Sequence, residues 1–173
     1  MEPGSKSNLK QQIAALRSSN RSVILTTVKD LRADGDVSVL PELFNLLLIQ
    51  EDDEIHRGIT SLLNDLKEKE ASDVLAKAIS NPDFRRIQTS LVAACWQNGL
   101  SYARHLPVFV DVLVNGTYSA AVEAFTVIEE AVGELEEKDR DKLLRSLKSQ
   151  LHKVDEQKKD LFAEMVRTIE RYG

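Results

Sequence analysis

Two serines and the single cysteine are the side chains of this chain that could act as nucleophiles. Ser61 and Ser90 occupy equivalent places in two similar segments, and Cys95 follows the second of them. A catalytic serine needs a base that a third group orients, and a catalytic cysteine needs an accessible thiolate. No G-x-S-x-G motif is present, and Cys95 falls on an apolar helical stripe, where cysteine behaves as a small hydrophobe. We therefore expect all three to be packing residues and the protein not to be an enzyme.

Histidine and acidic side chains are the potential metal ligands of this chain. His56, His105 and His152 are far apart in the sequence, and none belongs to an H-E-x-x-H motif. The acidic residues form no D-x-D-x-D-G loop of the kind that binds calcium. The sequence therefore predicts no metal site, and it gives no reason to expect a cofactor.

Arginine and tryptophan side chains are the best candidates for recognition. Arg57 and Arg86 occupy equivalent places, where they could pair with acids such as Asp53 and Asp83 or could bind a ligand. The only tryptophan, Trp96, falls beside the stripe that ends at Cys95, so it packs between helices or belongs to a binding surface, where tryptophan is enriched. The candidate binding surface comprises Trp96, Val92, Gln88, Thr89, Arg57, Arg86 and Lys67.

Charge is segregated toward the C-terminus. Residues 118–137 contain six glutamates and no lysine or arginine, whereas residues 138–159 contain eight bases and four acids. The acidic stretch is either a solvated surface or a contact patch for a basic partner, and its candidate residues are Glu129, Glu130 and Glu134.

These residues must be positioned by helices, because the sequence repeats itself with helical periodicity. A shift of 29 residues superimposes Thr60-Ser61-Leu62 on Thr89-Ser90-Leu91, and apolar residues recur in both segments at steps of three and four. The segments "LPELFNLLL" from Leu40 and "LPVFVDVLV" from Leu106 each carry a proline where a helix begins. Each repeat is therefore a helix, a short turn and a second helix.

Five such helical hairpins account for the chain. Residues of good N-cap type precede the second helices, namely Asn20, Asp53, Asp83, Thr117 and Asp155. Glycines Gly35, Gly99 and Gly133 supply breaks between hairpins. The prediction is an all-α protein with a single domain over residues 1–173 and hairpins at about 5–32, 36–68, 70–98, 99–132 and 137–172.

The segments "DDEIHRGITSLL" from Asp52 and "PDFRRIQTSLV" from Pro82 resemble the HEAT repeat signature, including that of the phycobilisome-lyase HEAT-like repeats. The resemblance implies a right-handed α-α superhelix, or solenoid, in which the second helices line a concave surface. It also implies that Arg57 and Arg86 join a ladder with acids of neighbouring repeats. The arginine is absent from the unit "GTYSAAVEAF".

The ends of the chain are more polar than its middle. The first helix and the last carry apolar residues on one side and polar residues elsewhere, Lys158 among them. Because terminal repeats must be soluble on one face, we expect a monomer. The formal net charge of −5 argues against a general nucleic-acid binder, and the longest apolar run is too short to span a membrane. A lone cysteine and the absence of a signal sequence favour the cytoplasm.

The function that fits these features is a non-catalytic protein-interaction or scaffold module that binds a partner protein on its concave face. The alternative is an accessory factor or enzyme of the HEAT-like type, either a chromophore lyase or a protein that acts on DNA bases as in repair.

Overall fold

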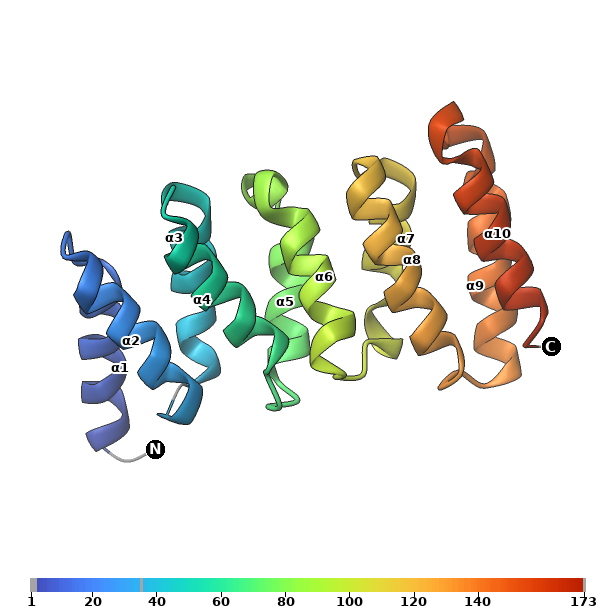
Figure 1. Ribbon diagram of the computed structural model, residues 1–173. Coiled ribbons are helices and arrows are strands. Elements are labelled where there is room, and N and C mark those ends of the chain that lie inside the picture. The colour runs from blue at the N-terminus through green and yellow to red at the C-terminus, as the bar shows by residue number, and fades with distance from the viewer. Residues whose placement is uncertain (1–2, 35, 173) are drawn as a thin grey trace. The chain divides into compact units, whose positions relative to one another are not determined.

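The computed structural model describes residues 3–34 and 36–172, and it confirms the all-α prediction. These ranges contain ten α-helices in five successive pairs and no β-strand (Figure 1). The predicted break at Gly35 lies outside the described residues. The helices are α1 (Pro3–Leu16), α2 (Arg21–Asp34), α3 (Leu40–Ile49), α4 (Asp53–Asn64), α5 (Ala71–Ile79), α6 (Gln88–Asn98), α7 (Leu106–Asn115), α8 (Tyr118–Val132), α9 (Glu137–Gln150) and α10 (Lys159–Glu170).

Local sequence explains where several helices begin. Pro41 and Pro107 occupy the first turns of α3 and α7, as predicted. The Thr117 hydroxyl accepts a hydrogen bond from the backbone N–H of Ala120 at 3.2 Å, so Thr117 is the N-cap of α8. The side-chain oxygen of Asn20 likewise accepts from Ser22 N–H at 2.9 Å ahead of α2.

Other predicted caps are shifted. Asp52, not Asp53, caps α4, because its carboxylate accepts from the N–H groups of Glu54 and Ile55, both at 3.0 Å. Asp83 is not an N-cap either, since it lies within the 3-10 helix η2 (Pro82–Ile87). Its backbone N–H donates a hydrogen bond to the side-chain oxygen of Asn81 at 3.0 Å. Asp155 precedes the 3-10 helix η5 (Glu156–Lys158), but its side chain makes no capping bond there.

The end of α6 depends on a glycine. Gly99 has a φ of +68°, a left-handed conformation that costs other residues energy and that commonly ends helices. This agrees with the predicted break at position 99.

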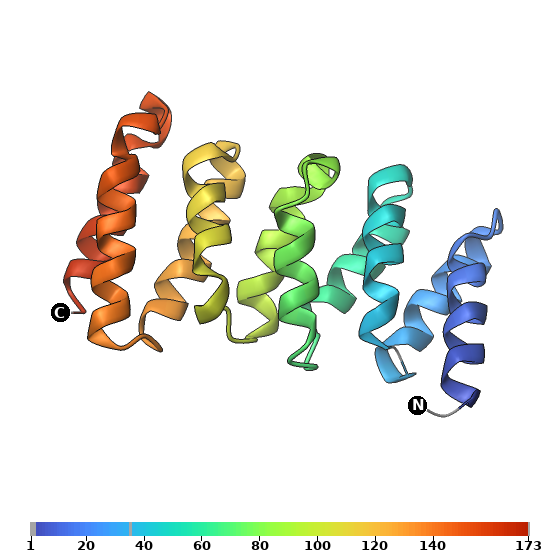
Figure 2. The same cartoon turned by 180° about the vertical axis from the view of Figure 1, so that it is seen from behind.

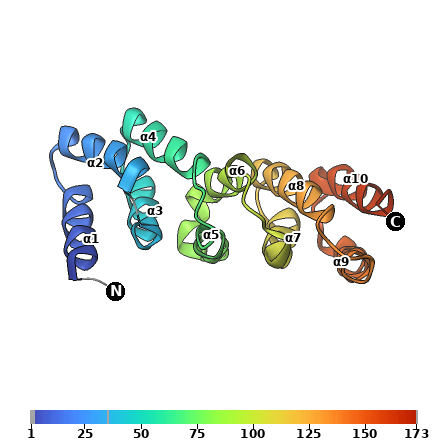
Figure 3. The same ribbon diagram turned by 90° about the horizontal axis from the view of Figure 1, so that it is seen from below.

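The chain divides into two compact units, Met1–Ile87 and Gln88–Gly173. In the first unit, α1, α3 and α5 lie in one layer, and α2 and α4 lie side by side in the other (Figures 2 and 3). The apolar stripes face the space between the layers, where Leu43, Ile59 and Leu75 are fully buried. The ring of Phe44 meets that of Phe84 edge to face, with centroids 6.0 Å apart.

In the second unit, α6, α8 and α10 form one layer, with α8 in contact with both other helices, and α7 and α9 form the other layer (Figure 3). Phe109, Ile128 and Phe162 are fully buried in its core. The edge-to-face pair of Tyr102 and Phe109, 5.5 Å apart, packs the turn after α6 against α7.

Lys158 corrects the expectation that it lies on the polar outer side of the last hairpin. Only 3% of the residue is exposed, and its ammonium group donates hydrogen bonds to the carbonyl oxygens of Val114 and Gly116, the latter at 2.8 Å. The last carbonyls of a helix have no partner within the helix, and a cation is favourable at that end. Lys158 therefore satisfies the C-terminal end of α7 from the neighbouring hairpin.

Candidate interaction surface

The thiol of Cys95 is placed where it cannot act as a nucleophile. Only 1% of the residue is exposed, and its Sγ–H donates to the Leu91 carbonyl oxygen at 3.3 Å. Burial raises the pKa of this thiol to about 12, although a hydrogen bond with Tyr102 acts in the opposite direction. Asn98 donates to the Tyr102 hydroxyl at 3.1 Å, so Cys95 belongs to a buried structural cluster. The packing interpretation of Cys95 is confirmed.

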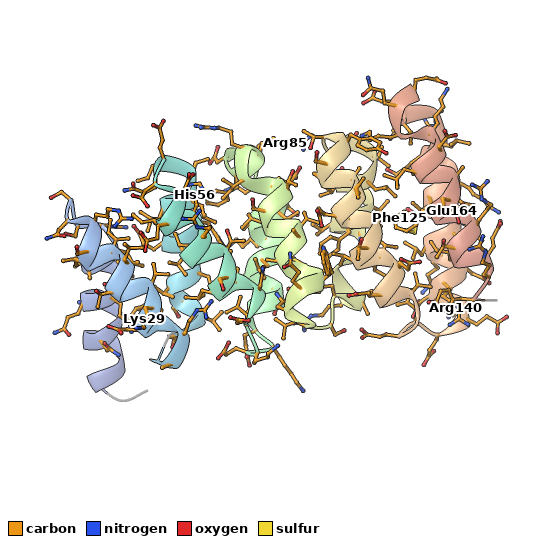
Figure 4. All side chains as sticks on the ribbon, in the orientation of Figure 1. Lys29, His56, Arg85, Phe125, Arg140 and Glu164 are labelled. Carbon is orange, nitrogen blue, oxygen red and sulfur yellow. The ribbon has the colours of Figure 1, made fainter. Side chains whose placement is uncertain are left out.

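The two candidate serines lie at the surface and not in the core. Ser61 and Ser90 are both exposed, so the prediction that they are packing residues is wrong. The Ser61 hydroxyl accepts a hydrogen bond from the Arg32 guanidinium. The imidazole of His56, which is labelled in Figure 4, contacts the backbone oxygen of Gln50 at 2.7 Å. Ser61 thus contributes to a surface network and has an arginine, not a general base, beside it.

Arg57 and Arg86 do not form the expected pairs with Asp53 and Asp83. Both arginines are exposed, and neither forms an ion pair within residues 3–34 and 36–172. Other arginines join the first two hairpins instead. Arg17 donates to both carboxylate oxygens of Glu42 at 2.7 Å. Arg21 donates to Asp52 at 2.7 Å and also to Glu54. Arg32 forms an ion pair with Asp65 at 3.1 Å.

A small pocket in the first unit lies beside this network. Its volume is about 290 Å³, and Leu31, Leu62 and Leu66 line it together with the paired Arg32 and Asp65. Asp36, Lys67 and Glu68 also line the pocket, so charges of both signs surround it.

The predicted binding surface is only partly exposed. Val92 and Gln88 are buried, with 0% and 4% exposure, so their assignment to an exposed inner face is wrong. The reason is that the buried side of α6 is a broad arc, which includes the positions of Gln88 and Val92, and not one narrow stripe. Thr89 is half-buried, and Trp96 is 36% exposed. Arg57, Lys67 and Arg86 are exposed residues of the first unit.

Trp96 is held in place by the neighbouring helix. Its indole N–H donates to a carboxylate oxygen of Glu123 on α8, at 2.7 Å. Val122, beside Glu123, is an apolar side chain with 38% exposure. Val122, Thr126 and Glu130 follow one another at steps of four, so they lie on the same side of α8. We call Trp96, Val122, Glu123, Thr126, Glu129 and Glu130 the α6–α8 face.

The sequence analysis does not identify three members of this face. Val122 and Thr126 belong to no candidate set, and Glu123 is counted only among the six glutamates of the acidic stretch. The four-residue spacing from Val122 to Glu130 was visible in the sequence, but the contact between Trp96 and Glu123 depends on how α6 packs on α8.

The acids of the predicted patch lie at the surface. Glu129, Glu130 and Glu134 are exposed, and the Ser101 hydroxyl donates to Glu134. Partial burial, with the nearby charge of Glu129, raises the pKa of Glu130 above its ordinary value. Arg167 of the adjacent α10 and Arg171, which follows that helix, are both engaged with Glu164, which is labelled in Figure 4. Both arginines therefore pair with an acid of their own hairpin.

No group of histidine, cysteine and acidic side chains in the described residues could hold a metal ion. Within the same residues, none of the helices combines the length and apolarity required to cross a bilayer. No family model and no curated protein matches the chain.

Proposed function

We propose that this protein is a non-catalytic interaction module that binds a partner protein through the α6–α8 face. The observation that carries the proposal is the exposed Trp96, whose indole is fixed by Glu123 next to the exposed Val122. Tryptophan is enriched among the residues that dominate binding energy, and a preorganised side chain loses less entropy when a partner binds. The inert environment of Cys95 supports a function without covalent catalysis.

We further propose that the five hairpins stack as a right-handed, HEAT-like α-α superhelix that places the second helices on a concave surface. The 29-residue repeat and the two-layer packing within each unit support this arrangement. In this proposal the chain is a single scaffold domain that acts as a cytoplasmic monomer without a cofactor.

The charge of the face favours protein over nucleic acid. A member of the HEAT-like type that acts on DNA bases would need a basic concave surface, whereas α6 and α8 contain no lysine or arginine. A chromophore lyase remains the alternative within an accessory role, and it would need a bilin-carrying partner.

The proposal is tested by capturing partners from an extract of the source organism with the wild-type protein and with Trp96→Ala and Val122→Ser variants. We expect both variants to lose the same partner, measured by quantitative mass spectrometry. Leu151→Ser is the matched control, because Leu151 is 50% exposed but belongs to neither α6 nor α8.

Thermal unfolding of each variant separates binding from folding. The partly exposed Val122 should tolerate serine with a loss of about 1 kcal/mol or less in unfolding free energy. The proposal fails if Val122→Ser and the control capture the same partners equally, or if Trp96→Ala loses its partner only because it unfolds.

A further inference from the structure

The α6–α8 face carries one sign of charge. Helices α6 and α8 together contain no lysine or arginine, whereas Glu123, Glu129 and Glu130 all belong to α8. Among the described residues, the only hydrogen-bond partner of these three carboxylates is the neutral indole N–H of Trp96. Their negative charge is therefore not neutralised by the helices that build the face.

The position of Glu129 and Glu130 is electrostatically unfavourable. Both lie in the last turns of α8, where the helix dipole is negative, and no basic residue lies in the last turn. They are also adjacent to each other, and the raised pKa of Glu130 reflects its partial burial and the charge of Glu129. A bound cation would reduce this repulsion, so binding of a positively charged segment here is electrostatically favourable.

The environment of Trp96 suits arginine in particular. A guanidinium group is planar and stacks on an aromatic ring while its N–H groups bond to carboxylates in the same region. The Glu123 carboxylate lies 2.7 Å from the indole nitrogen, which places a negative charge at the edge of the ring. Lysine could pair with the carboxylate but has no planar group to stack on the indole.

We propose that the α6–α8 face binds an arginine-containing amphipathic segment of the partner protein. In this arrangement one guanidinium stacks on Trp96 beside Glu123, a second cation lies between Glu129 and Glu130, and an apolar residue covers Val122. This inference rests on the proposed function and adds the chemistry of the partner. The negative face repels nucleic acids and anionic membranes, which therefore serve as contrasting ligands in the test.

The test uses fluorescence, because Trp96 is the only tryptophan and reports on this face alone. A short synthetic peptide of leucine and arginine is titrated into the full-length protein, beside versions in which lysine or glutamine replaces arginine. We expect the arginine peptide to change the Trp96 emission and to bind more tightly than the lysine peptide. The glutamine peptide should not bind.

The charges are then tested with matched variants. Replacing both Glu129 and Glu130 by glutamine should weaken the arginine peptide about tenfold, the combined effect of two surface ion pairs. The control is Glu51→Gln with Asp53→Asn, which changes the net charge equally at two exposed acids of the first unit. This control should bind the peptide like the wild type.

Three results would overturn the inference. The first is that both double variants weaken binding of the arginine peptide equally, and the second is that the arginine and glutamine peptides bind equally well. The third is that vesicles rich in phosphatidylserine, or duplex DNA, bind more tightly than the arginine peptide. Failure here is distinguishable from failure of the proposed function. If the captured partner depends on Trp96 but not on Glu129 and Glu130, the interaction module stands and only the chemistry assigned to its partner is wrong.

Discussion

The ammonium group of Lys158 lies 2.8 Å from the carbonyl oxygen of Gly116, although the two residues are 42 positions apart. Lys158 immediately precedes α10, and Gly116 immediately follows α7, so the contact joins the last two hairpins. The lysine is buried, whereas Asp155, the acid at 3.9 Å, is exposed. The two backbone carbonyls therefore lie closer to this charge than the Asp155 carboxylate does.

Replacing Lys158 by methionine should destabilise the second unit. Methionine has a similar length but no donor, so the carbonyl groups of Val114 and Gly116 would remain buried without this partner. We expect the free energy of unfolding to fall by about 1–3 kcal/mol, as for other buried polar groups that lose a partner. Urea denaturation followed by circular dichroism measures the change.

The matched control is Lys159→Met. Lys159 is the adjacent lysine, half its side chain is exposed, and it pairs with Glu156 three residues earlier. Exposed pairs of this kind contribute little, so the control should lose less than about 1 kcal/mol. Equal losses in the two variants would show that the buried hydrogen bonds of Lys158 do not stabilise the fold.

Asp52 should make stability depend on pH. The hydrogen bond from Arg21, with those from the N–H groups of Ile55 and Glu54, lowers the pKa of Asp52 below its ordinary value. A carboxyl whose pKa is lower in the folded state stabilises the fold above its unfolded pKa, and this contribution is lost as the pH falls through the folded pKa. Asp52→Asn should therefore be less stable than the wild type at neutral pH.

The difference should shrink as the pH falls below about 4, the ordinary pKa of an aspartate. Asparagine still caps a helix, so the variant removes the charge and keeps the cap. Thermal unfolding across the acid range measures both proteins, with Asp53→Asn as the control, because no base pairs with Asp53 in the described residues. A difference that does not change with pH would contradict this account of Asp52.

Cys95 should be unreactive in the folded protein. Burial raises the pKa of its thiol to about 12, so the reactive thiolate is absent at neutral pH and the thiol is shielded from reagents. We expect a chromogenic disulfide reagent to label the chain only as fast as the surrounding structure opens, and faster as urea is added. The unfolded chain should react at once at its single thiol, whereas immediate labelling of the folded protein would refute the assignment.

The helices were predictable because their signals are local. Apolar spacing, the prolines of α3 and α7 and the Thr117 cap depend on neighbours within a few residues. The sequence predicts the cap of α4 one residue late because Asp52 and Asp53 are both good N-cap types. The sequence does not show which carboxylate reaches the free N–H groups.

The exposure of the site residues and the pairing of the arginines depend on how the helices pack. The sequence identifies Trp96 as a candidate, but it also assigns the buried Val92 and Gln88 to the same surface, because a repeat pattern does not show how much of α6 its neighbours cover. Arg57 and Arg86 matched the repeat signature, yet Arg21 and Arg32 lie closer to acids of the next hairpin. Such pairings follow from the relative position of whole helices, which no short stretch of sequence encodes.

The acceptors of the Lys158 hydrogen bonds determine which substitutions can remove this contact during evolution. Val114 and Gly116 contribute peptide oxygens, which every amino acid supplies, so mutations there cannot remove the acceptors themselves. Selection for the donor acts at position 158, whereas at Gly116 it acts on space, because a Cβ there would clash with the Val112 carbonyl oxygen. Methods that infer proximity from correlated substitutions would therefore overlook this connection between hairpins, even in a large set of relatives.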